Sequence, residues 1–268
     1  AGFNRKAEET SLGQVLWDPM DGGEIRLSSG GTLFMEEGAF LDVSGGAPVE
    51  VTRMNDANQV ETYTAASRPG TIALSFYSSQ SKEGVSFLHA SYAGNRYMDT
   101  LPGASFVIEQ TDKEKILVLP HDFWEGIENT GFDQLSLTSW GGIKFLGSPT
   151  IDMAEKISIN TPALYGVMQN AIGLNTKWFE LKNTILSEEP EETEDPAEEI
   201  LDRSNLVVNA QFIDIHGDVK AKGFADIHLM AQEDIRLSDH KYNRVGTSRT
   251  GWYGGLTTDR DLTLAGAR

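Results

Sequence analysis

The stretch Gly22-Gly-Glu-Ile-Arg-Leu-Ser-Ser-Gly-Gly-Thr-Leu-Phe-Met-Glu-Glu-Gly-Ala-Phe-Leu-Asp-Val-Ser-Gly-Gly46 decides the expected fold. Three short segments open in it with an apolar residue, at Ile25, Leu33 and Leu41, eight positions apart. Apolar and polar residues alternate within these segments, which is the pattern of a half-buried strand. Glycine-rich turns separate the segments. The stretch therefore predicts short β-strands joined by tight corners.

The same eight-residue spacing recurs further along the chain. It relates Leu135, Ile143, Ile151 and Ile159 to one another, and Ile227 to Ile235. Corners of three or four residues fit an antiparallel meander, or a solenoid in which each strand pairs with a strand one full coil later. Glycine adopts the left-handed and extended backbone that solenoid corners need. The repeat therefore favours the solenoid.

We expect an all-β fold, a right-handed parallel β-helix (β-solenoid) with loop excursions. Three strands of about eight residues give a coil of about 24 residues. The general rule for parallel crossovers makes the coil right-handed. Three apolar pairs should then stack in the core: Ile25 with Val49, Leu135 with Ile159, and Ile213 with Ile235.

Breaks in the repeat predict the domain organisation. Residues 1–186 should form the β-helix, with excursions at about 52–69, which is polar and irregular, and at about 77–103, where tyrosines stand among serine and glycine. Residues 163–186 fit either a short helix or a further strand.

The acidic run of residues 187–199 has a composition typical of disorder. We therefore expect an acidic flexible insertion at 187–203. Residues 204–268 should continue the β-helix, with an excursion at about 239–257. Because neither end of the sequence resembles a natural boundary, we expect the chain to be an internal segment of a longer rod.

Charge and composition narrow the classes of partner. The net charge of −18 would repel nucleic-acid phosphates, so nucleic acid is not an expected partner. No apolar run approaches the ~18 residues of a membrane span, so membrane insertion is not expected either. The sequence has no cysteine, which excludes disulfides and thiolate metal sites.

Residues 22–46 resemble the repeats of filamentous-haemagglutinin-type exoproteins, in which a glycine-flanked strand leads to a Leu-Asp-Val-Ser-Gly-Gly corner. Residues 70–75, 122–137 and 259–265 resemble further repeats. This resemblance implies an internal rod segment of a large two-partner-secretion adhesin. An outer-membrane secretion partner would then export the chain to the extracellular space or the bacterial cell surface.

The resemblance implies a role in adhesion, biofilm or extracellular filament assembly, and not an enzyme. The partner would be a glycan or other ligand on a host or cell surface, or a second copy of the chain in a filament. Tyr92, Tyr97, Trp252 and Tyr253 are the expected contacts, because exposed aromatic rings stack on sugars. The alternative is a polysaccharide-degrading parallel β-helix enzyme, a lyase or glycosidase, which needs carboxylates close together on one face or a carboxylate–Arg/Lys–calcium cluster.

Two short motifs bring imidazoles and carboxylates onto outward positions. They are Asp214-Ile-His216-Gly-Asp218 and Asp226-Ile-His228, and such groups can bind a divalent cation or exchange protons. The expected register instead places Asp214 beside Arg236 as an opposite-charge pair. Asp226 and His228 would lie on another face, as the remaining metal candidates. We expect no cofactor, with calcium the one possible exception, and no catalytic residue.

Overall fold

The protein is described by a computed structural model that covers residues 4–9, 15–19, 21–36, 38–54, 59–78, 90–98, 100–128, 130–167, 170–185, 203–238 and 255–266. Strands dominate these residues, so the all-β prediction is confirmed. The one helix among them is α1 (His121–Ile127). Within the described ranges, no helix has the length and apolar character to cross a membrane.

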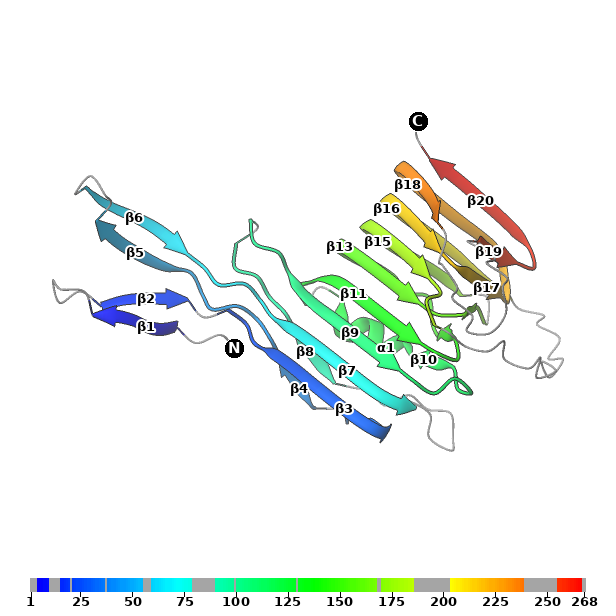
Figure 1. Cartoon of the computed structure of the whole chain (residues 1–268), viewed down its shortest axis with the longest axis horizontal. Helices are drawn as coiled ribbons and strands as arrows, with labels where there is room; N and C mark the ends of the chain where they lie inside the picture. Colours follow the sequence, from blue (N-terminus) through cyan, green and yellow to red (C-terminus); the bar gives the residue numbers. More distant parts are fainter. Residues whose placement is uncertain are drawn as a thin grey trace, which may run out of the picture.

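The largest element is an all-parallel sheet of nine strands (Figure 1). Each strand pairs with the strands that precede and follow it in this sheet along the chain. The members are β3 (Glu24–Thr32), β7 (Thr71–Ser78), β9 (Ala104–Gln110), β11 (Phe132–Ser139), β13 (Thr150–Asn160), β15 (Ala171–Lys182), β16 (Ser204–His216), β18 (Phe224–Ser238) and β20 (Asp261–Gly266).

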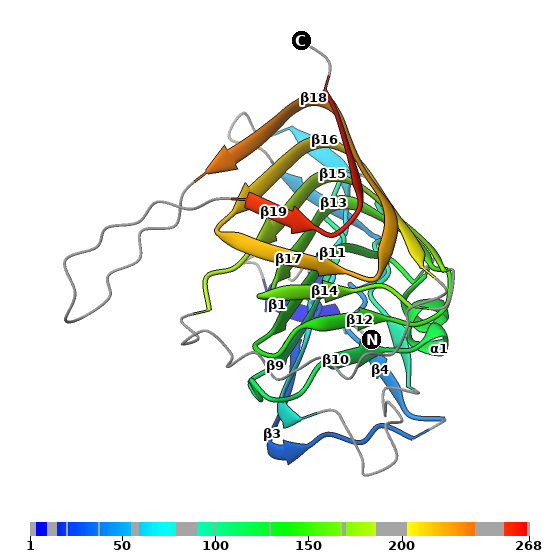
Figure 2. The ribbon, with the colours of Figure 1, turned by 90° about the vertical axis from the view of Figure 1, so that its right-hand side faces the viewer.

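A second parallel sheet has five short strands, also paired in chain order. They are β10 (Leu117–Leu119), β12 (Ile143–Phe145), β14 (Ala163–Tyr165), β17 (Asp218–Lys222) and β19 (Gly255–Thr258). From β9 to β15 and from β16 to β20 the chain alternates between the two sheets. Figure 2 shows the sheets on two sides of a common interior.

Three two-stranded sheets complete the described structure. β4 (Phe40–Asp42) pairs in parallel with β8 (Ser91–Ala93). Of these two strands, β8 lies within the second expected excursion. β1 (Asn4–Glu9) with β2 (Val15–Pro19), and β5 (Val49–Met54) with β6 (Val60–Ala65), form antiparallel hairpins. The hairpins project from one end of the parallel sheet (Figure 1). The first expected excursion thus contains the end of β5 and all of β6.

The core is a stack of apolar columns that runs across the strands of the large sheet. One column has a buried side chain from each of six successive strands, and its members are Ile72, Phe106, Leu135, Ile157, Phe179 and Ile213. Strict alternation produces this column, because every second residue of a strand points to the same face. Each buried side chain contributes about 1.5–3 kcal/mol.

The structure corrects two of the three expected stacking pairs. Ile213 pairs with Ile235 as predicted. Leu135, however, pairs with Ile157 instead of Ile159, because paired strands with no insertion between them lie 22 residues apart and not about 24. Ile25 pairs with Ile72, because the β5–β6 hairpin is inserted between their strands.

Some segments that the eight-residue spacing separates are single strands in the structure. Ile151 and Ile159 both belong to β13, and Ile227 and Ile235 both belong to β18. Register shifts interrupt the pairing of these strands, between Met153 and Lys156 in β13. A bulge changes the phase of alternation without ending a strand, so it mimics a corner in the sequence. Residues 163–186 contain the strands β14 and β15, so the strand alternative was right there.

Glycine forms the corners around β17. Gly217 and Gly223 have φ of +75°, a region that side chains with a Cβ rarely adopt. A Cβ on Gly223 would also lie 2.3 Å from the carbonyl oxygen of Gly166, which follows β14, the neighbour of β17 in the five-stranded sheet. These corners let the chain pass from the large sheet to the small one and back.

Candidate functional site

The outward face of the large sheet carries the richest group of charged side chains in the described residues. Alternation turns every second residue of β13, β15, β16 and β18 outward, and parallel pairing aligns these residues in rows. The central row is Ser158, Glu180, Asp214 and Arg236. The flanking rows are Lys156, Trp178, Phe212 and Asp234 on one side, and Asn160, Lys182, His216 and Ser238 on the other.

Glu180 is the centre of this face, and its side chain is 15% exposed. Its Oε2 atom accepts hydrogen bonds from Ser158 Oγ at 2.7 Å and Lys182 Nζ at 2.8 Å, and lies 3.1 Å from Lys156 Nζ. Burial by itself would raise the pKa of Glu180, but the bonds from Lys182, Ser158 and Lys156 outweigh it and lower the pKa to about 2. Glu180 is therefore a carboxylate at every physiological pH.

Asp214 is the second buried carboxylate, with a side chain 7% exposed. Arg236 donates two hydrogen bonds to this carboxylate, from Nε to Oδ1 at 2.6 Å and from Nη2 to Oδ2 at 2.9 Å. Trp178 Nε1 donates a third bond at 2.7 Å to Oδ2. The predicted pairing of Asp214 with Arg236 is confirmed, and its bidentate geometry is the strong form of such a pair.

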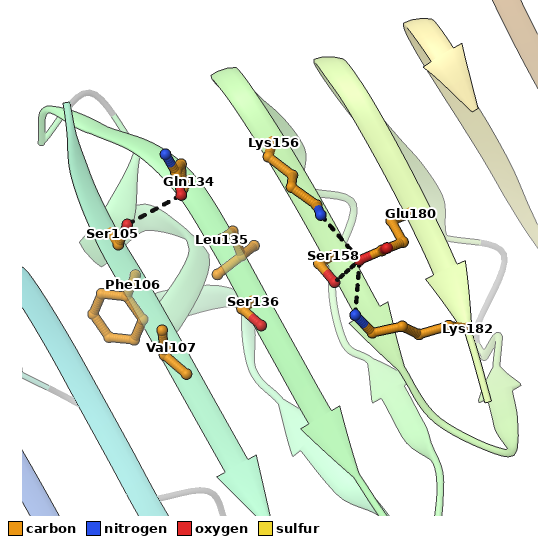
Figure 3. A pocket seen from close by; sticks show the side chains of 10 residues that line it. All are labelled: Ser105, Phe106, Val107, Gln134, Leu135, Ser136, Lys156, Ser158, Glu180 and Lys182. Carbon is orange, nitrogen blue, oxygen red and sulfur yellow. Dashed lines mark hydrogen bonds and ion pairs between the residues drawn. The ribbon is translucent and has the colours of Figure 1, made fainter. Parts of the chain in front are cut away.

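A hollow of about 260 Å³ opens on this face beside Glu180 (Figure 3). Uncharged residues of β9, β11 and β13 form most of its lining, while Lys156, Glu180 and Lys182 stand together at one side. At the other side Ser105 Oγ donates to Gln134 Oε1 at 3.3 Å. Phe106, Val107 and Leu135 add an apolar part, so the hollow is lined by polar and apolar groups together.

The paired carboxylates are arranged for binding rather than for proton transfer. Glu180 and Asp214 are direct neighbours in the β15–β16 register, as a glycosidase pair would have to be. A general acid, however, needs a raised pKa, so that it carries a proton near neutral pH. The pKa of Glu180 is lowered to about 2, and the oxygens of Asp214 are engaged by Arg236 and Trp178. Charge recognition is the chemistry that this geometry favours.

Protein-family models, curated proteins and solved structures give no match to this chain. The assignment of a function therefore rests on the geometry and on the motifs of the sequence.

Tyr92 is a correction to the expected contact surface. It lies on β8 with 2% exposure, and its ring packs edge-on against Phe106 with centroids 4.7 Å apart. Burial raises the pKa of its hydroxyl. The pairing of β8 with β4 turns this ring into the core, where no ligand reaches it. Tyr97, in the loop that follows, is 51% exposed.

The other expected contacts and the acidic insertion fall outside the described residues. Trp252 and Tyr253 belong to the undescribed residues 239–254, and the run 187–199 belongs to 186–202. The last residues of the expected excursion at 239–257 form the start of β19, which pairs with β17.

Asp226 and His228 both lie on β18 and are partly buried. In register, Asp226 aligns with Asn205 and Asp261, while His228 aligns with Val207 and Thr263. Asp226 thus has one further carboxylate beside it, and His228 has no neighbouring ligand type in its row. Across the ranges that the structure describes, no group of three or more His, Cys, Asp or Glu side chains is placed to hold a metal ion.

The sequence interpretation missed the Glu180 cluster. Its members come from β13 and β15, and lie next to one another because these strands are 22 residues apart. The signal was present in the outward positions of residues 177–182, Lys-Trp-Phe-Glu-Leu-Lys, once that register is known. With the expected coil of about 24 residues, Glu180 and Ser158 do not align.

Proposed function

We propose that this chain is a right-handed parallel β-helix and forms a rod segment of a large, secreted, fibrous surface protein. Its role is adhesion, biofilm formation or extracellular filament assembly. The observation that carries the proposal is the pairing of nine parallel strands in chain order.

The parallel sheets support a rod because each coil packs only on its two neighbours. At the usual separation between neighbouring strands, a sheet of nine strands measures roughly 38 Å from its first strand to its last. Every coil adds one rung to the core columns and one rung to the outward rows. A surface of outward side chains aligned in rows is suited to an extended polymer such as a glycan, which can contact several strands in succession.

The family resemblance of residues 22–46 supports the cellular setting. In this proposal an outer-membrane secretion partner exports the chain, and the rod is displayed at the bacterial cell surface or released. The net charge of −18 disfavours nonspecific binding of such a rod to nucleic acid and anionic lipid. The ligand is a glycan or another cell-surface molecule, or a second copy of the rod.

A polysaccharide-degrading enzyme is the second candidate. The observation in its favour is the adjacency of Glu180 and Asp214 on one outward face. The lowered pKa of Glu180 and the hydrogen bonds from Arg236 to Asp214 favour binding over cleavage at this pair of carboxylates.

One assay separates the two candidates. The chain is applied to acidic and neutral polysaccharides, with and without calcium, and both retention and chain cleavage are scored. Retention without cleavage is the expected result for an adhesive rod, and cleavage would reverse the proposal. A filament role predicts concentration-dependent growth in light scattering, and a strictly monomeric chain that retains no polysaccharide would refute both binding and assembly.

A further inference from the structure

The hollow beside Glu180 carries a positive charge in an otherwise strongly acidic chain. Its charged lining residues are Lys156, Lys182 and Glu180, which leave one net positive charge. The neighbouring Asp214–Arg236 pair is neutral as a unit. Asp234 is exposed and three strands away from Lys156 in the flanking row, about 14 Å at the usual spacing, so solvent screens it.

The two ammonium groups are held in place before any ligand arrives. The side chains of Lys156 and Lys182 are 35% and 28% exposed, so most of each stem is covered. Lys156 Nζ also lies 5.1 Å from the centroid of the Trp178 ring. Both amines already converge on one carboxylate oxygen of Glu180, and each has further N–H donors. An incoming acid group would therefore cost little ordering of these side chains.

The rest of the lining mixes polar groups with the apolar residues Phe106, Val107 and Leu135, a combination that suits the hydroxyls and C–H faces of a sugar ring. Ser105, Gln134, Ser136 and Ser158 offer hydroxyl and amide groups, which can both donate and accept hydrogen bonds. The Ser136 hydroxyl has no hydrogen-bond partner within the described residues. The volume of about 260 Å³ lies below the ~300–1,000 Å³ of a site for a drug-sized molecule, so it suits one substituted ring of a longer polymer.

We infer that this hollow binds the acid group of an acidic polysaccharide, a carboxylate or a sulfate ester on a sugar ring, with Lys156 and Lys182 as the cationic ligands. The inference rests on the proposed function and adds to it a ligand class and a site. A single negative charge neutralises the excess charge of the hollow. The serine and glutamine groups take up the ring hydroxyls.

The test measures binding of the full chain to four polymers at about 0.15 M salt, where distant acidic residues are screened beyond roughly 8 Å. Polygalacturonate presents sugar carboxylates, dextran sulfate presents sulfate esters, dextran is neutral, and polyglutamate presents carboxylates on a peptide. We expect one or both acidic polysaccharides to bind, and to bind more tightly than dextran or polyglutamate. The stronger of the two identifies the acid group.

Three charge variants locate the site. Lys156→Gln and Lys182→Gln should each weaken binding about tenfold, because each removes one cationic ligand. Lys220→Gln is the matched control, since it makes the same change at an exposed position of the five-stranded sheet, and it should leave affinity unchanged. Circular dichroism and the unfolding midpoint establish that each variant is folded.

Glu180→Gln gives a gain that a damaged fold cannot produce. It removes the carboxylate that competes for both amines and raises the charge of the hollow to two. Affinity for the acidic polysaccharide should rise about fivefold. A folded Glu180→Gln chain that binds no more tightly than the unchanged protein would contradict the role of the two lysines.

The outcomes separate this inference from the proposed function. Retention of neutral dextran alone would overturn the inference and keep an adhesive rod. Equal binding of an acidic polysaccharide by the unchanged chain and both lysine variants would move the site elsewhere and overturn the inference. Polyglutamate bound as tightly as the polysaccharides would overturn the sugar class. Retention of none of the polymers would count against the inference and glycan adhesion together.

Discussion

Replacing Glu180 by glutamine should produce a loss of stability that depends on pH in a predictable way. The pKa of Glu180 lies at about 2 in the folded chain, against an ordinary value of 4.5. A carboxyl group whose pKa is lower in the folded state stabilises that state above its unfolded pKa, and this contribution disappears as the pH falls through the folded pKa. The gap corresponds to about 3 kcal/mol at neutral pH.

The difference in unfolding free energy between the unchanged chain and Glu180→Gln should therefore be about 3 kcal/mol at pH 7. It should shrink between pH 4.5 and about 2 and approach zero below that range, because a protonated glutamate closely resembles glutamine. Urea unfolding at a series of pH values measures it, since urea adds no ionic screening.

Glu155→Gln is the control for this experiment, because it makes the same change at an exposed position of β13. It should change stability by less than about 0.5 kcal/mol at any pH. A Glu180→Gln effect that is the same at pH 7 and pH 2, or as small as that of the control, would refute the charge-based account of the cluster.

Three further substitutions test the rest of the structure by urea unfolding. Asp214→Ala should cost about 2–4 kcal/mol, because it leaves a guanidinium and an indole N–H without their acceptor, and a cost below ~1 kcal/mol would contradict the pair. Phe106→Ala should cost about 3–5 kcal/mol, because it removes a fully buried side chain from the core. Its control is Phe40→Ala, at a residue 60% exposed, which should cost well under ~1 kcal/mol. Similar costs for the two substitutions would argue against the assigned core. Gly223→Ala should destabilise the folded chain by more than ~1 kcal/mol, because φ is +75° and the new Cβ would meet a backbone carbonyl. Gly255→Ala is its control, because a Cβ there would meet nothing within 4 Å.

The strand content and the inward faces could be predicted from the sequence. In β9, for example, Ala104, Phe106 and Ile108 point inward and Ser105 and Glu109 outward, as alternation predicts, whereas Val107 and Gln110 depart from the pattern. This prediction succeeds because the direction of a side chain in a strand is set by the local backbone. Glycine corners such as Gly217 and Gly223 are readable for the same reason, since the conformation they need belongs to one residue.

The number of residues that separates paired positions on neighbouring strands could not be predicted from the sequence. A bulge between Met153 and Lys156 lengthens β13 and changes its phase, so that an eight-residue repeat of apolar residues does not mark eight-residue strands. Tyr92 shows the same limit, because its burial depends on β4, whose residues lie about fifty positions earlier in the chain. A tyrosine among serines and glycines gives no local sign of such a partner.

The candidate site divides along the same line. The Asp214–Arg236 pair was predictable because the apolar pair Ile213 and Ile235 precedes it on the same two strands and sets their register. The cluster at Glu180 was not, because the expected spacing of about 24 residues places Ser158 beside Lys182, whereas the strands pair Ser158 with Glu180.

By itself, the sequence determined that this chain is built of strands, which of their residues point inward, and where several corners fall, because these properties are local to a few residues. Only the tertiary structure decided which strands lie side by side, which charges meet at Glu180, and where a hollow opens. Contacts between neighbouring parallel strands join residues 22 or more positions apart, and the length of every insertion between them changes the partner. Their register is therefore a property of the whole sheet, and not of any short segment.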